Sequence, residues 1–357
     1  MESIGSAQAD RQRALLNQNK NHAIEWYRYF FSCFICALHF KEYKGADYPF
    51  GGAYLGVEFF FIVSGFFLMK TISETPVSDI GSATVAFLKK RVYRLYPHYI
   101  FSYSILAAYC ILVRRSVTIK DLLIHYVDEI LMLQMAGAGK HLNAALWYIS
   151  ALLLVSVIVF FLAHKVGRAF TQIVAPGLVL LIYSYFYQTR GTLAGVGWNN
   201  LLIVRDGFWR GLAGISLGCI VYGIYTHVSP NGQRMKTLRT IYEIGTLCLL
   251  SIMFFREGCT VKDFTLVGMM ALLLLSIMCG GSYLTKLLEK VKIDGGYAYG
   301  MYCNHWILNY FIRDFFPGRP FCPMLCVYLT ATVIMSVLTT KLVNWILLQC
   351  SIDNRTN

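Results

Sequence analysis

The chain has 357 residues, of which 57% are hydrophobic and only 14% are charged, with a mean hydropathy of +0.53. An ordinary soluble domain carries about 25% charged residues, so this composition excludes a soluble globular protein. The formal net charge of +13 falls mostly in the short polar segments between apolar runs. That distribution indicates membrane topology and contact with anionic lipids, and we expect no nucleic-acid partner.

Apolar runs of membrane-spanning length, about 17–25 residues, recur from end to end, and we expect about ten transmembrane helices. The runs are 23–42, 52–70, 95–113, 146–163, 169–187, 207–226, 239–255, 264–281, 297–312 and 322–349. They predict an all-α, polytopic membrane helix bundle over 22–349, with a polar segment at 1–21 and a tail at 350–357. Lys and Arg are more numerous in the alternate loops that lie on the side of both termini, so we expect both termini to be cytoplasmic.

The first apolar run contains Arg28 and His39, eleven residues apart. Eleven residues of α-helix end about 20° past three full turns, so both side chains share one face, roughly 16 Å apart along the axis. A charged group facing lipid is costly, which indicates that this face is turned to the protein interior and serves a function there. Histidine changes protonation near neutral pH and therefore suits proton transfer.

The second run contains an acid, Glu58, followed seven residues later by Gly65. With the first helix running outward and the second inward, His39 and Glu58 both fall in the outer half of the membrane, where they can meet. Alternatively, Glu58 neutralises a charge elsewhere in the bundle. Gly65 shares the face of Glu58 and permits the close approach of another backbone or of a ligand.

Arg91 and Arg94 lie three residues apart just before the third run, as neighbours on one helical face. Paired guanidinium groups suit phosphate, which arginine binds bidentately. Basic residues at an inner membrane boundary also follow from insertion topology alone. Arg210, at the outer end of the sixth run, is expected to snorkel to the membrane interface.

Several weaker features complete the pattern. Segment 121–134 of the longest outer loop has apolar residues at three- and four-residue steps, which predicts an amphipathic surface helix. The cysteines sit mostly within apolar runs, as small core residues, and no His/Cys spacing predicts a metal site. Trp147 fits an interfacial aromatic belt or a surface that stacks on sugars. His305 is either a structural histidine bonded to a neighbouring helix or a substrate contact.

Taken in order, these segments resemble the acyltransferase 3 family of bacterial membrane acyltransferases, from about residue 22 to 345. The family begins with an arginine and a histidine spaced like Arg28 and His39. Its next motifs match Gly56-Val-Glu58-Phe-Phe-Phe-Ile-Val-Ser64-Gly65-Phe66 and Arg91-Val-Tyr-Arg94-Leu-Tyr-Pro97. Weaker matches are Leu146-Trp147-Tyr-Ile-Ser150 and Tyr299-Gly-Met-Tyr302-Cys-Asn-His305. Many relatives carry a glutamate shortly after the tryptophan, where this chain has Ala151 and Leu152.

The resemblance implies a multi-pass acyltransferase of the bacterial plasma (inner) membrane. It would carry an acyl group, expected to be acetyl, from cytoplasmic acyl-CoA to a hydroxyl of an extracytoplasmic or lipid-linked glycan. Acetyl-CoA would be a co-substrate, and no permanently bound cofactor is implied.

The resemblance also implies roles for individual residues. His39 would act as general base, or become acylated itself and relay the group. Glu58 would orient the imidazole. Arg28 would be a third catalytic residue and would hold a phosphate or the pantetheine amide oxygen of the donor. Arg91 and Arg94 would bind CoA, and the acceptor would contact Trp147 and His305.

Two other functions fit parts of the pattern. In a proton-coupled secondary transporter or polysaccharide exporter, Arg28, His39 and Glu58 would form a proton relay. The two halves of the chain show no repeat, which argues against that class. A non-catalytic membrane receptor would leave the order of the motifs unexplained. Consumption of acetyl-CoA by membranes that contain the protein distinguishes the three.

Overall fold

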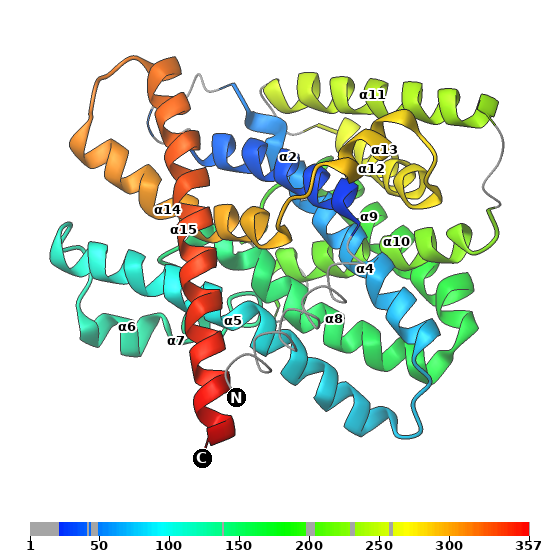
Figure 1. Ribbon diagram of the computed structural model, residues 1–357, viewed down its shortest axis with the longest axis horizontal. Coiled ribbons are helices and arrows are strands. Elements are labelled where there is room, and N and C mark those ends of the chain that lie inside the picture. Colours follow the sequence, from blue (N-terminus) through cyan, green and yellow to red (C-terminus); the bar gives the residue numbers. More distant parts are fainter. Residues whose placement is uncertain are drawn as a thin grey trace.

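The computed structural model describes residues 21–40, 43, 49–137, 139–197, 204–228, 233–256 and 260–356. Over these ranges the fold is entirely helical (Figure 1). All of the predicted apolar runs form helices, and the described residues include eight helices that are long and apolar enough to cross a membrane. The predicted polytopic helix bundle is therefore confirmed. The helices that carry the Arg28–His39 pair and His305 are more polar and stand outside those eight.

The long helices are α2 (His22–His39), α4 (Gly56–Glu74), α5 (Ile80–Leu112), α8 (Trp147–Val166), α9 (Ala175–Arg190), α10 (Asp206–Tyr225), α11 (Gln233–Phe255), α12 (Lys262–Cys279), α14 (Gly295–Phe315) and α15 (Phe321–Thr356). The shorter ones are η1 (Gly51–Leu55), α6 (Ile119–His125), α7 (Val127–Ile130), η2 (Ala144–Leu146), the π-helical turn η3 (Phe170–Val174) and α13 (Tyr283–Lys290). Most of the amphipathic segment predicted at 121–134 is thus helical, but it is divided between α6 and α7.

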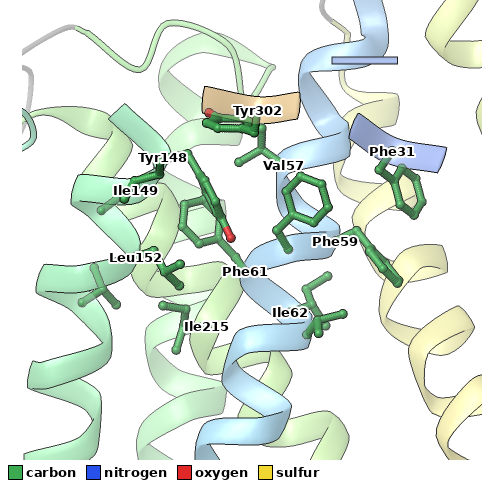
Figure 2. Close-up of a cluster of buried hydrophobic side chains, with 14 of the residues drawn as sticks. Phe31, Val57, Phe59, Phe61, Ile62, Tyr148, Ile149, Leu152, Ile215 and Tyr302 are labelled. Carbon is green, nitrogen blue, oxygen red and sulfur yellow. The ribbon is translucent and has the colours of Figure 1, made fainter. Parts of the chain in front are cut away.

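Helices α4, α8 and α10 form the centre of the molecule. In the most apolar stretch of Gly51–Glu74, which includes α4, 89% of the residues are buried, against 17% in that of α15, which packs against α14. A helix that is hydrophobic on all sides belongs in a protein interior, and α4 shows this pattern. Its buried side chains include Phe59, Phe61 and Ile62 (Figure 2). The prediction of core cysteines is confirmed for Cys36, Cys110, Cys219 and Cys303, whereas Cys33 is only partly buried and Cys248 is exposed.

Helices α4 and α10 pack backbone against backbone through two glycines. A Cβ atom at Gly65 would collide with the carbonyl oxygen of Ile215, and one at Gly218 would collide with that of Ile62. Small residues allow this approach, so the close contact expected at Gly65 is confirmed. The contact is with another helix of the same chain.

Helix α5 begins fifteen residues before the apolar run predicted at 95–113. The added residues are largely polar, so the apolar run did not include them. Its 33 residues extend for about 50 Å, well beyond the bilayer core of about 30 Å. Asp79 caps its start by accepting hydrogen bonds from the backbone N–H groups of Gly81 and Ser82 at 3.0 and 3.1 Å. Arg91 and Arg94 therefore lie on a continuous helix and not in the loop that precedes it.

Candidate active site

Three arginines from two helices gather at the end of the bundle expected to face the cytoplasm. Arg28 of α2 interacts electrostatically with both Arg91 and Arg94 of α5. Glu25, one turn before Arg28, pairs with it at 2.9 Å. The Arg91 guanidinium lies 5.0 Å from the centre of the Phe87 ring. Among the described residues, Arg91 forms no ion pair with an acid, whereas Arg94 interacts electrostatically with the same Glu25.

The arginine cluster (Arg28, Arg91 and Arg94) thus carries more positive than negative charge. Arg91 is partly exposed and Arg94 is exposed, so both remain accessible to a ligand. Guanidinium groups arranged in this way bind phosphate oxygens bidentately. The spacing in the sequence predicted the α5 pair, and the structure adds Arg28 to it.

Tyr148 of α8 links the arginine cluster to the core. Its hydroxyl lies within hydrogen-bonding reach of Ser64 and interacts electrostatically with Arg28 and Arg91. Its ring is buried, with its centroid 5.2 Å from that of Tyr302 of α14 (Figure 2). From the sequence, Tyr148 fits an interfacial aromatic belt or a sugar-stacking surface together with Trp147, and its contacts with the arginines were not predicted. Its position next to Trp147 at the start of α8 was the available signal.

His39 lies at the opposite end of α2, where its ring stacks on that of His305 with centroids 5.0 Å apart and planes at 30°. The Trp306 ring stands edge-on to His39 at 5.1 Å. Tyr302 lies 5.8 Å from His305, so aromatic rings connect Tyr148 with the two histidines. His305 Nδ1 contacts carbonyls of its own helix, and the expected hydrogen bond to a neighbouring helix is not what the structure shows.

Glu58 does not meet His39, contrary to the contact proposed from the sequence. Its carboxylate accepts hydrogen bonds from Arg210 Nε and, at 3.2 Å, from the Tyr183 hydroxyl. Arg210 also donates to two backbone carbonyls at 2.9 and 3.1 Å. It is 1% exposed, so the prediction that it snorkels to the interface is wrong. A buried charge needs a partner of opposite sign, and Glu58 provides it.

Trp147 belongs to the surroundings of this ion pair. The Arg210 guanidinium lies 5.4 Å from the Trp147 ring and 5.3 Å from that of Tyr54. The Tyr54 hydroxyl donates to Asp263 of α12, which extends the polar network. The sequence did contain a signal for the pair, since Glu58 and Arg210 are opposite charges inside apolar runs.

Glu129 of α7 fixes the outer loop against α14. It is fully buried, and its carboxylate accepts backbone hydrogen bonds from Leu142 and Asn143 at 2.6 and 2.8 Å. The Asn143 side chain donates to the carbonyl of Cys303, two residues before His305. Burial raises the pKa of Glu129 to about 8. The sequence analysis assigned no role to this residue.

Fold and geometry define a multi-pass helical membrane protein with an arginine cluster near one end of α2 and two stacked histidines at the other. The acyltransferase 3 family model, described as an acyltransferase domain, matches residues 21–341. The chain belongs to this family, which confirms the resemblance, and it is therefore a membrane acyltransferase. No curated protein and no solved structure matches it.

Proposed function

We propose that the protein transfers an acyl group, expected to be acetyl, from cytoplasmic acyl-CoA to a hydroxyl of an extracytoplasmic or lipid-linked glycan at the bacterial plasma (inner) membrane. The observation that carries the proposal is that Arg28, which belongs to the arginine cluster, and His39 lie toward opposite ends of one helix, α2. One end suits an anionic donor. The other end offers a base to an incoming hydroxyl.

On the donor side, the phosphates of CoA are the ligand that matches the arginine cluster. Arg28, Arg91 and Arg94 supply three guanidinium groups, and Glu25 is the one acid among the described residues that interacts with Arg28 and Arg94. The acyl thioester then lies beyond the cluster, toward Tyr148 and the histidines. Acyl-CoA acts as a co-substrate, and free CoA leaves after each turnover.

On the acceptor side, His39 accepts the hydroxyl proton while the hydroxyl oxygen attacks the thioester carbonyl. The new C–O bond forms, the C–S bond breaks, and the imidazolium returns its proton to the departing thiolate. An acyl-histidine relay is the second mechanism: His39 attacks the thioester first and then passes the acyl group to the hydroxyl. Glu58 supports the site indirectly, through the packing of α4 against α10.

A proton-coupled transporter fits less well. Its relay would require Glu58 to exchange protons with His39, and Glu58 is instead paired with Arg210 and Tyr183.

The proposal is tested with membranes from cells that express the full-length protein and from cells that lack it. Both are given acetyl-CoA labelled in the acetyl group, and CoA release and label in glycan and lipid fractions are measured. Expression of the protein is expected to increase both. Equal CoA release and equal labelling in the two preparations would overturn the proposal.

A further inference from the structure

Helix α13, with its caps Ser282 and Val291, turns a polar side to the protein and part of its apolar side outward. Ser282 and Thr285 are fully buried, whereas Tyr283, Leu287 and Val291 are 48%, 59% and 49% exposed, respectively. A surface helix of a soluble protein does the reverse and buries its apolar side. The outward apolar side chains therefore indicate that this helix lies in apolar surroundings.

The polar side of α13 is fastened to a buried carboxylate. Glu243 of α11 is 0% exposed and accepts hydrogen bonds from the Ser282 and Thr285 hydroxyls at 2.6 and 3.1 Å. The Thr240 hydroxyl of the same helix accepts from the backbone N–H of Tyr283 at 2.9 Å. These contacts fix the rotation of α13 about its own axis. The outward direction of its apolar side chains is thus built into the fold.

Helix α13 lies at the end of the bundle expected to face the cytoplasm. It follows α12, a candidate membrane span, after Gly280 and Gly281, whose positive φ angles turn the chain sharply. On the other side, the Trp26 indole of α2 donates to the Val291 carbonyl at 2.8 Å. A short amphipathic helix directly after a membrane span lies where the lipid headgroups begin.

The outward side of α13 also carries basic side chains. Lys286 and Lys290 each follow an exposed apolar residue by three positions, so they are its neighbours on the helix surface, and both are exposed. Lys292 adds a third exposed charge just past the helix, against one exposed acid on α13, Glu289. Anionic lipid headgroups attract lysines at a membrane surface. The side chains therefore match a charged headgroup layer above an apolar one.

We infer that the outward face of α13 (Tyr283, Lys286, Leu287, Lys290 and Val291) binds anionic lipids of the cytoplasmic leaflet. The apolar side chains of this face enter the boundary of the lipid chains, and its two lysines contact the headgroup phosphates. The lipid is not a reactant, and its binding does not depend on acyl transfer. The α13 face is thus a lipid site beyond the proposed function.

The test places a fluorescent reporter on the α13 face. Purified full-length Leu287→Trp is reconstituted into phosphatidylcholine vesicles that contain increasing fractions of either brominated phosphatidylglycerol or brominated phosphatidylcholine. Brominated chains quench nearby indoles, and the emission of the added Trp is the difference from wild-type protein in the same vesicles. We expect the anionic lipid to quench it at a fraction at least about fivefold lower, because one lysine near an anionic surface contributes about that factor.

The charge of the α13 face is then removed in the reporter protein. Lys286→Gln/Lys290→Gln should abolish the preference for the anionic lipid. The matched control is Lys120→Gln/Lys140→Gln, which removes the same charge from exposed positions in the outer loop and should leave the preference unchanged. Saturating acetyl-CoA should leave it unchanged as well, because a lipid phosphate and not a soluble one occupies the lysines.

Four results would each contradict the inference. Absence of quenching by either lipid would mean that protein, such as a second copy of the chain, covers the α13 face. Equal quenching by the two lipids, or an unchanged preference in Lys286→Gln/Lys290→Gln, would show that the lysines do not select anionic lipid. Loss of the preference in acetyl-CoA would assign the lysines to the donor instead. Failure of the proposed function is separate, because the quenching requires no acyl transfer.

Discussion

The imidazole of His39 is the general base of the proposed reaction. His39→Gln retains a polar side chain at the partly exposed end of α2, so insertion and abundance should be unchanged. Acyl transfer should fall by about 10²–10⁴-fold, the usual contribution of a general base. The measurement is transfer of labelled acetyl to membrane glycans, with the exposed His227→Gln as control. Wild-type transfer by a well-expressed His39→Gln protein would remove His39 from the mechanism.

Arg94 is expected to act on donor binding. Removing one charge-assisted contact costs about 1.5–3 kcal/mol, so Arg94→Ala should raise the KM for acetyl-CoA by roughly ten- to a hundredfold. Arg94→Lys should recover only part of the affinity, because lysine lacks the bidentate fork. The neighbouring exposed Lys90→Ala serves as control. A normal acetyl-CoA KM in both Arg91→Ala and Arg94→Ala would mean that these arginines serve membrane topology alone.

Because Glu58 is paired with Arg210, we expect substitutions in this pair to reduce the stability of the fold more directly than the catalytic rate. Arg210→Ala leaves a buried carboxylate uncompensated and should lower the free energy of unfolding by about 3–5 kcal/mol. The double variant Glu58→Gln/Arg210→Met removes both charges and should recover much of this loss. Thermal unfolding in detergent measures both. If Glu58→Gln keeps its stability but shifts the pH–rate profile, Glu58 acts on His39 after all.

At the level of helices, the backbone contact between α4 and α10 predicts opposite effects for the same substitution at different glycines. Gly65→Ala and Gly218→Ala force the helices apart and should each destabilise by about 1–3 kcal/mol. Gly245→Ala, on α11, meets no atom within 4 Å and should stabilise by about 0.5–1 kcal/mol through helix propensity. Melting temperatures of the three variants test this. Equal shifts would contradict the close packing.

The outer loop is expected to lose stability as the pH rises. The pKa of Glu129 is raised from 4.5 to about 8 in the folded protein, so the folded state holds a proton that the unfolded chain releases. Its contribution is fully present below about pH 4.5 and is lost as the pH rises through 8. The difference in melting temperature between the wild type and Glu129→Gln, measured from pH 5 to 9, should therefore narrow with pH. A constant difference would contradict it.

For the molecule as a whole, the positions of the helices could be predicted from the sequence, whereas the contacts between helices could not. Apolar runs predicted every long helix, because a segment that spans a membrane must be apolar along its length. The polar start of α5 was missed for the same reason. The pair of Glu58 and Arg210 joins residues 152 positions apart, and only the packing of α4 beside α10 brings them together.

Helix α2 fixes the distance between Arg28, which is proposed to bind the donor, and the proposed base His39. It is a single helix from His22 to His39, so Arg28 and His39 cannot approach one another, and the gap stays at roughly 16 Å. The helix acts as a ruler for the donor, which must be long enough to reach His39 while its phosphates stay at Arg28. A truncated thioester such as S-acetyl-N-acetylcysteamine has no phosphates, so the arginine cluster does not position it. It should acylate the acceptor slowly and with the same efficiency in wild type and Arg94→Ala, whereas acetyl-CoA should distinguish them.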